Sequence, residues 1–232
     1  MKKLLLFLAA ALFIAAPLCA QQRYTQQQKM RYTDFINAIR RCNIAEVRKG
    51  IQDKLPLNIN TPDEQRDTLL IIAVRNECKE AAFMLLAAGA SPMPNRNTLT
   101  SPLNLIMEKP SSSSMGDWND IVVKMLEANA NPNYKNANGE HALIIAARGN
   151  KRYYVQSLLD NSSVRLDQAD NTGRTALHWA AAGNYGGIIE DLCDANASFS
   201  KRDNDGRTPL AIAQAFRNNA AEAAIRECLQ YT

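Results

Sequence analysis

The chain has 232 residues, of which 46% are hydrophobic and 6% aromatic. Its 27 basic and 23 acidic side chains leave a formal net charge of +4 at pH 7. So small an excess selects no class of partner. Because no basic cluster alternates with aromatic residues, the composition also disfavours a nucleic acid as the ligand. The many alanines favour helices packed through small side chains over a thick sheet core.

Residues 1–20 are typical of a secretory signal peptide. Two lysines precede an apolar run from Leu4 to Ala16, which is too short to span a bilayer. The small residue Ala20 predicts cleavage directly after it, and therefore a periplasmic or secreted protein. A lipoprotein with Cys19 as its first mature residue is disfavoured, because the residues just ahead of Cys19 do not fit the lipidation pattern.

The glutamine-rich residues 21–32 predict a flexible segment, and nothing after them resembles a membrane-spanning helix. The rest of the chain is periodic. Five segments share a short string: "TLLIIAV" from Thr68, "SPLNLIM" from Ser101, "HALIIAA" from His141, "TALHWAA" from Thr175 and "TPLAIAQ" from Thr208. The shared leucines, Leu70, Leu103, Leu143, Leu177 and Leu210, are 33, 40, 34 and 33 residues apart. A weaker copy, "TDFINAI" from Thr33, has Phe35 at the leucine place. A second apolar string follows most copies, so each unit predicts a helix, a short turn, a second helix and a loop.

This pattern resembles the ankyrin repeat family, and the unit that begins at Asp170 matches it best. The resemblance implies an all-α solenoid of about six helix-turn-helix units, with short loops or β-hairpins between them. The units are predicted at about 33–62, 63–95, 96–135, 136–169, 170–202 and 203–231, and the third carries an inserted loop at 108–120. The chain departs from the family where Arg66 replaces a loop glycine, and where Asn150 and Asn184 replace the glycine after the first helix.

The two histidines are expected to be structural. His178 occupies the family's histidine place, where the resemblance implies that its ring binds the loop backbone and holds one unit to the next. The other units carry Ile71, Asn104, Ile144 and Ala211 there, and His141 occupies the threonine place, so we expect no histidine ladder. Two isolated histidines supply neither a metal site nor a catalytic triad. We therefore expect no catalytic residue, metal or cofactor.

Export would leave four cysteines in an oxidising compartment. Register suggests pairing Cys42 with Cys78 and Cys193 with Cys228, because the members of each pair occupy similar places in adjacent units. Three connectivities are formally possible, and similar places in stacked units can lie too far apart for a bridge. Four buried free thiols are the alternative.

Partner-binding residues are predicted from the family's concave face, which carries the two variable places after the alanine pair and the loop residues around the glycine. These places hold Arg40, Arg41, Arg75, Asn76, Arg148, Arg174 and Arg207. Because arginine binds carboxylates through a two-pronged contact, the hypothesis is that this stripe binds an acidic segment of a partner protein. The alternative is a set of solvated helix ends. Trp118, at the edge of the inserted loop, either contacts a partner or covers the second helix of its unit.

The first interpretation of function is an exported, monomeric, non-enzymatic module that binds another protein through its concave face and loop tips. A second is a secreted effector that binds a host protein. A hydrolase with the solenoid as its body is a remote third, because no phosphate-binding loop, metal-ligand spacing or nucleophile with a nearby histidine is present in the sequence.

Overall fold

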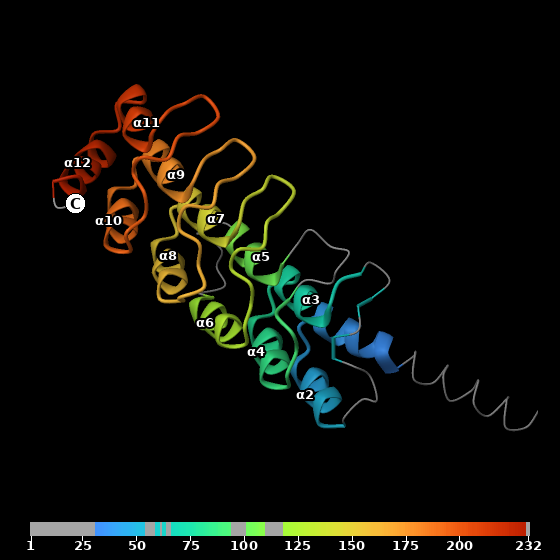
Figure 1. Cartoon of the computed structure of the whole chain (residues 1–232). Coiled ribbons are helices and arrows are strands. Elements are labelled where there is room, and N and C mark those ends of the chain that lie inside the picture. Colours follow the sequence, from blue (N-terminus) through green and yellow to red (C-terminus); the bar gives the residue numbers. More distant parts are fainter. Residues whose placement is uncertain are drawn as a thin grey trace, which may run out of the picture.

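The computed structural model describes residues 31–53, 59–60, 62–63, 66–93, 101–109 and 118–230. These residues form six pairs of helices that stack side by side (Figure 1). The predicted all-α solenoid is confirmed, and the described part contains no strand, so the joining segments seen there are loops rather than β-hairpins. The predicted signal peptide, nearly all of the glutamine-rich segment and the middle of the inserted loop lie outside the described residues.

The helices lie in two rows. The first pair is the helical segment at residues 31–40 with α2 (Ile44–Gln52). The other pairs are α3 (Leu69–Arg75) with α4 (Lys79–Ala87), α5 (Pro102–Glu108) with α6 (Asn119–Glu127), α7 (Ala142–Arg148) with α8 (Arg152–Leu159), α9 (Ala176–Ala182) with α10 (Gly186–Asp194), and α11 (Pro209–Ala215) with α12 (Asn219–Cys228). The first helix of each pair lies in the inner row and the second in the outer row. The long loops between units project from the side of the inner row (Figure 1).

The threonine or serine that opens most repeat strings is a helix cap. Thr68 Oγ1 accepts a hydrogen bond from the Ile71 amide at 3.3 Å, and Ser101 Oγ accepts one from the Asn104 amide at 3.0 Å. Thr208 caps α11 in the same way. Such a cap satisfies an amide that the first turn of a helix leaves without a partner. The recurring hydroxyl therefore marks where α3, α5 and α11 begin.

Turn residues that replace the family's glycines have a left-handed backbone. Asn150 and Asn184, at the family's glycine place, have φ values of 55° and 59°. Arg66, which replaces a loop glycine, has φ 67°, close to the 75° of Gly139 at the same place two units later. Asparagine and glycine tolerate this conformation well, whereas an arginine is strained in it. The backbone of the repeat thus holds even where the residue type changes.

Burial is concentrated where units meet. The seventh residue of the outer helices α4, α6, α8, α10 and α12 is Leu85, Met125, Leu158, Leu192 and Ile225, each 0% exposed. Fully burying one such side chain contributes about 1.5–3 kcal/mol relative to leaving it in water. Each unit contacts only its neighbours, so these junctions contribute to stability together with the packing inside each unit. Within the described residues, no helix combines the length and hydrophobicity needed to cross a bilayer.

The outermost junctions are also joined covalently. Cys42 and Cys78 form a disulfide with a Cα–Cα distance of 5.4 Å, and Cys193 and Cys228 form another at 6.2 Å. The first joins the first two units and the second joins the last two.

In two other units, hydrogen bonds are made from the repeat place that Cys78 occupies. Cys78 lies eight residues after its repeat leucine. At the same place Lys151 donates to the Met107 carbonyl at 2.7 Å, and Asn218 donates to the Ala181 carbonyl at 2.8 Å. One repeat place therefore links each of these units to the end of the preceding inner helix, through different chemistry.

Candidate functional site

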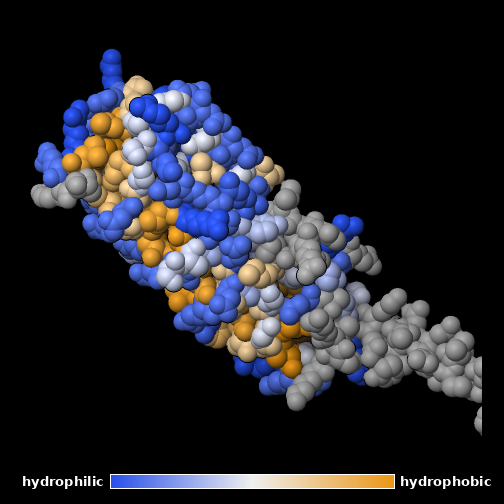
Figure 2. All heavy atoms as spheres, viewed as in Figure 1, coloured by the Kyte–Doolittle hydropathy of each residue, from blue (hydrophilic) through white to orange (hydrophobic). Residues whose placement is uncertain are grey.

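The predicted arginines gather on the inner face, which we define as the long loops together with the exposed sides and ends of the inner-row helices. Five of them hold carboxylates of their own chain: Arg40 with Asp63, Arg75 with Asp67, Arg148 with Glu140, Arg174 with Asp203, and Arg207 with Asp203 and Asp205. Arg41 is exposed, and Asn76 donates to the Ile72 carbonyl of its own helix at 2.8 Å. In the view of Figure 2, hydrophilic residues cover most of the side on which the loops project.

These ion pairs are part of the fold rather than loose surface contacts. The Asp203 side chain is only 1% exposed and accepts from Arg207 Nε and Nη2 at 3.1 and 2.9 Å. Burial alone would raise the pKa of Asp203, but hydrogen bonds from the Arg207 backbone and side chain outweigh it and lower this pKa to about 2. At Asp67 the balance is reversed: burial raises its pKa despite the attraction of Arg75.

These internal ion pairs bear on the hypothesis that the arginine stripe binds an acidic segment of a partner. A carboxylate from a partner would have to compete with one that is already buried against each guanidinium, as at Arg148 and Glu140, whose nitrogen and oxygen lie 2.9 Å apart. Much of the positive charge is therefore neutralised within the chain. The arginines still present partly exposed guanidinium planes, since the Arg148 side chain is 42% exposed.

Trp179 lies between two of these arginines. The Arg174 guanidinium lies 5.0 Å from the centre of the Trp179 ring and that of Arg148 lies 5.8 Å from it, while Trp179 Nε1 donates to Asp170 Oδ2 at 2.8 Å. We call Arg148, Trp179 and Arg174 the central array. Sequence reasoning missed Trp179 as a site residue. The signal was its place two residues after the repeat leucine, beside a variable place of the preceding unit and a loop place of its own unit.

Trp118 is buried, and the hypothesis that it contacts a partner is not supported. It precedes α6 directly, is 2% exposed, and its amide donates to Tyr154 Oη at 3.2 Å. An indole so little exposed offers almost no surface to another protein. The structure shows the alternative role, in which Trp118 covers the start of the second helix of its unit.

The two histidines do not converge on one pocket, and each lies against a carbonyl of the loop that follows its helix pair. His178 Nδ1 accepts from the Thr175 amide at 3.2 Å, and its Nε2 lies 3.1 Å from the Arg207 carbonyl. His141, from a different repeat place, puts its Nε2 3.1 Å from the Gln168 carbonyl. Sequence reasoning did not predict that His141 would lie against a loop carbonyl as His178 does.

The environment of both rings favours neutral imidazoles. Burial lowers the pKa of His141 to about 4, and burial also lowers the pKa of His178. Among the described residues no group of three histidine, cysteine or acidic side chains could hold a metal ion.

The loop tips beside the central array are locked together. The Asn171 amide donates to the Asn138 carbonyl at 3.0 Å, and the Asn204 amide donates to the Thr172 carbonyl at 3.0 Å. A Cβ on Gly139 would lie 2.8 Å from the Asn171 amide nitrogen, so only glycine allows the tips to approach this closely. The inner face is therefore a pre-ordered surface rather than a set of independent loops.

Known proteins share both the sequence pattern and this architecture. Residues 113–203 match the family model described as ankyrin repeats, 3 copies. The solved structure of EF0377, an ankyrin repeat protein, is 26% identical, has a TM-score of 0.72, and is matched over 83% of this chain and 96% of that one. An ankyrin repeat domain from Acinetobacter baumannii AYE is 28% identical with a TM-score of 0.72, over 84% of this chain and 97% of that domain.

The chain has the fold of an ankyrin repeat solenoid. A curated relative, Protein glp-1 of Caenorhabditis elegans, is 27% identical over 175 residues, which cover 69% of this chain and 13% of the relative. The solenoid thus corresponds to a small part of that larger protein. What it shares with its relatives is the stack of repeats, and ankyrin repeats are a scaffold for binding other proteins.

Proposed function

We propose that this solenoid is an exported protein-binding module whose inner face holds a partner protein, with the central array as the main contact. The observation that carries the proposal is Trp179 of α9, which is half-buried between Arg148 and Arg174 and lies beside loop tips that are hydrogen-bonded to one another. Tryptophan and arginine are enriched among residues that dominate binding energy, and an ordered surface loses little entropy on binding.

The partner contact that we propose is mixed rather than purely acidic. Internal carboxylates already neutralise the arginines, so the exposed guanidinium planes and the indole edge are the groups that remain to be covered. An acidic segment would add to this contact only where it displaces an internal partner. Reversing the charge of Arg75 or Arg148 tests that part, because unchanged affinity would rule out an acidic segment at these residues.

We propose a periplasmic location, with a secreted effector as the alternative. The support is the signal-peptide pattern of residues 1–20. Cell fractionation distinguishes the two locations, and the amino-terminal sequence of the processed chain tests cleavage after Ala20.

The test of binding is cross-linking of the tagged chain in its own cells, followed by mass spectrometry of the captured proteins. A partner held by the inner face should be recovered with the wild-type chain and lost with Trp179→Ala. The matched control is Tyr153→Ala, which removes a 75% exposed aromatic ring from α8 in the outer row. Equal recovery with both variants would contradict the proposal.

A further inference from the structure

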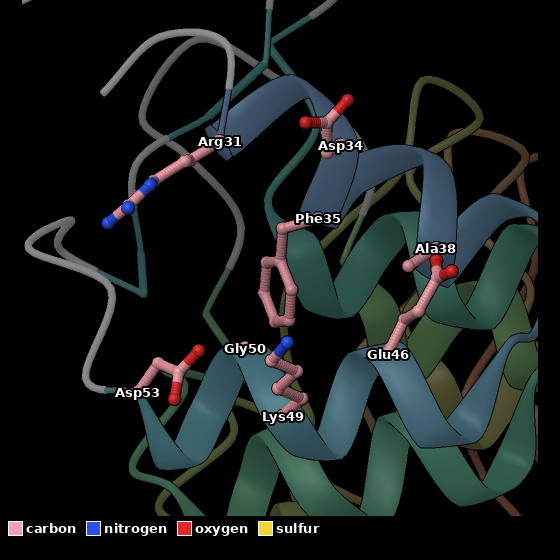
Figure 3. Close-up of a pocket in the computed structure, with 8 residues that line it drawn as sticks. All are labelled: Arg31, Asp34, Phe35, Ala38, Glu46, Lys49, Gly50 and Asp53. Carbon is pink, nitrogen blue, oxygen red and sulfur yellow. The ribbon is translucent and has the colours of Figure 1, made fainter. Parts of the chain in front are cut away.

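The amino-terminal end of the solenoid carries a groove of about 540 Å³ between the helical segment at residues 31–40 and α2. It is lined by Arg31, Asp34, Phe35, Ala38, Glu46, Lys49, Gly50 and Asp53 (Figure 3). Phe35 reaches from the first helix toward Lys49 and Gly50 on α2 (Figure 3). We call this the end groove. It faces the side on which an internal unit would meet the unit before it.

Gly50 explains why a groove exists here. It is the seventh residue of α2, and the seventh residue of every other outer helix is a fully buried leucine, methionine or isoleucine. The first unit alone lacks a side chain at this place. Glycine also weakens the interior of a helix. We therefore expect α2 to be less stable than an outer helix with a large apolar residue at this place.

The third and sixth residues of α2, Glu46 and Lys49, occupy places that face the preceding unit. In α10 the sixth residue is Asp191, which binds Arg152 of the preceding outer helix through a 2.7 Å contact. In the third place α6 and α10 carry the buried Ile121 and Ile188. Among the described residues no unit precedes the first, and at these places the first unit carries charges instead.

The charges around the end groove differ from those of the inner face in their pairing. Arg31, Lys49, Asp34, Glu46 and Asp53 make no ion pair within the part of the chain that the structure describes. This contrasts with the arginines of the inner face, five of which hold carboxylates. The rim thus offers both signs of charge around an apolar floor that includes Phe35, which is 7% exposed.

The opposite end is closed. The fourth and eighth residues of the outer helices face the following unit, as Cys193 shows by its disulfide to Cys228. These places hold apolar residues from α4 to α10, but in α12 they hold Glu222 and Arg226, whose oxygen and nitrogen lie 2.7 Å apart. A polar outer face is what a terminal repeat needs for solubility. Stacking of copies head to tail is therefore disfavoured.

We infer that the end groove is a self-association site, in which two copies of this chain meet through their amino-terminal units about a two-fold axis. A rim of mixed charges suits this occupant, because a two-fold axis places the cations of one copy against the acids of the other. The missing side chain at Gly50 lets the two α2 helices approach closely. The pair is closed, since the far ends cannot continue the stack, and both inner faces stay open.

The experiment is sedimentation velocity of the purified chain over a wide range of concentrations, with charge-reversed variants. The acidic variant is Arg31→Glu with Lys49→Glu, and the basic variant is Asp34→Lys, Glu46→Lys and Asp53→Lys. The wild-type chain should dimerise as concentration rises. Each variant should dissociate on the order of a hundredfold more readily, because like charges then face each other. Mixing the two variants should restore a one-to-one dimer.

Two controls keep the outcome interpretable. Arg226→Glu alters the closed end and should leave the dimer unchanged, whereas Gly50→Leu should give a monomer that is still folded by circular dichroism. A wild-type chain that stays monomeric at every concentration overturns the inference, and the end groove would then be covered by another protein or by residues before Arg31. A dimer that ignores the rim charges, or variants that fail to pair when mixed, would overturn it as well.

Discussion

The two ends of this solenoid present different surfaces on the side where a further unit would pack. At the carboxyl end, Glu222 and Arg226 replace the apolar residues that would face a following unit, and they pair with each other. At the amino end, Gly50 leaves a hollow, and the charges around it have no partners within the described chain. In a repeat protein each terminal unit has one neighbour instead of two. The carboxyl end therefore presents a closed polar surface, whereas the amino end presents the open groove that we infer to be an interface.

Removing a disulfide should change the free energy of unfolding most, and the two disulfides should differ because they lie at different ends. The bridges span sequence separations of 36 and 35 residues, so loop entropy assigns each a similar contribution of roughly 3–4 kcal/mol. Cys42→Ala with Cys78→Ala should lower the free energy of unfolding by more than Cys193→Ala with Cys228→Ala, because the hollow end has less packing to hold it. Urea denaturation measures both. Equal losses would mean that the two ends are equally well packed.

Lowering the pH should destabilise the middle of the stack, through His141, rather than its ends. The pKa of His141 is about 4 when folded, below its ordinary 6.5, so the folded state favours the neutral ring. Its contribution is complete above pH 6.5 and is lost as the pH falls through 4, by up to about 3 kcal/mol. His141→Thr, which restores the family's capping residue, should reduce that loss. The measurement is the free energy of unfolding against pH, and an unchanged acid slope in the variant would contradict the account.

Filling the end groove should stabilise the chain. Gly50→Ala tests helix propensity alone and should raise the free energy of unfolding by roughly 0.5–1 kcal/mol. Gly50→Leu adds the apolar side chain that other units bury and should gain about 1–2 kcal/mol beyond the alanine variant. Thermal unfolding of dilute protein compares the two. A leucine variant less stable than the alanine variant would show that the space is not available to a side chain.

The smallest effect is expected at the closed end. Glu222→Gln removes an exposed ion pair with Arg226, and such pairs contribute little and are screened by salt. The melting temperature should fall slightly at low salt and match the wild type at high salt. A large loss that salt does not remove would mean that this pair holds α12 in place rather than only covering it.

The architecture could be predicted from the sequence because the same pattern recurs from unit to unit. Repeat leucines at near-constant spacing set the register, and the turn backbone stays left-handed even where Arg66 replaces the loop glycine. The register also suggested the cysteine pairs that the structure joins. These features depend on backbone geometry, which every unit shares.

The site was less predictable, because side-chain partners depend on where rotamers meet in space. Register placed arginines on the inner face, but it did not reveal that Asp203 would hold two of them. It separated His141 from His178, although both reach a carbonyl of the following loop. Gly50 is inconspicuous in the sequence, since its meaning appears only when the outer helices are aligned and the first unit matches the pattern least well.

Hydrogen exchange of the wild-type chain at low and high concentration tests the difference between the ends most directly. If the amino-terminal unit is an interface, amides of α2 should exchange more slowly as concentration rises, while those of α12 should not change. Exchange in α2 that is independent of concentration, or equal slowing in both helices, would contradict it.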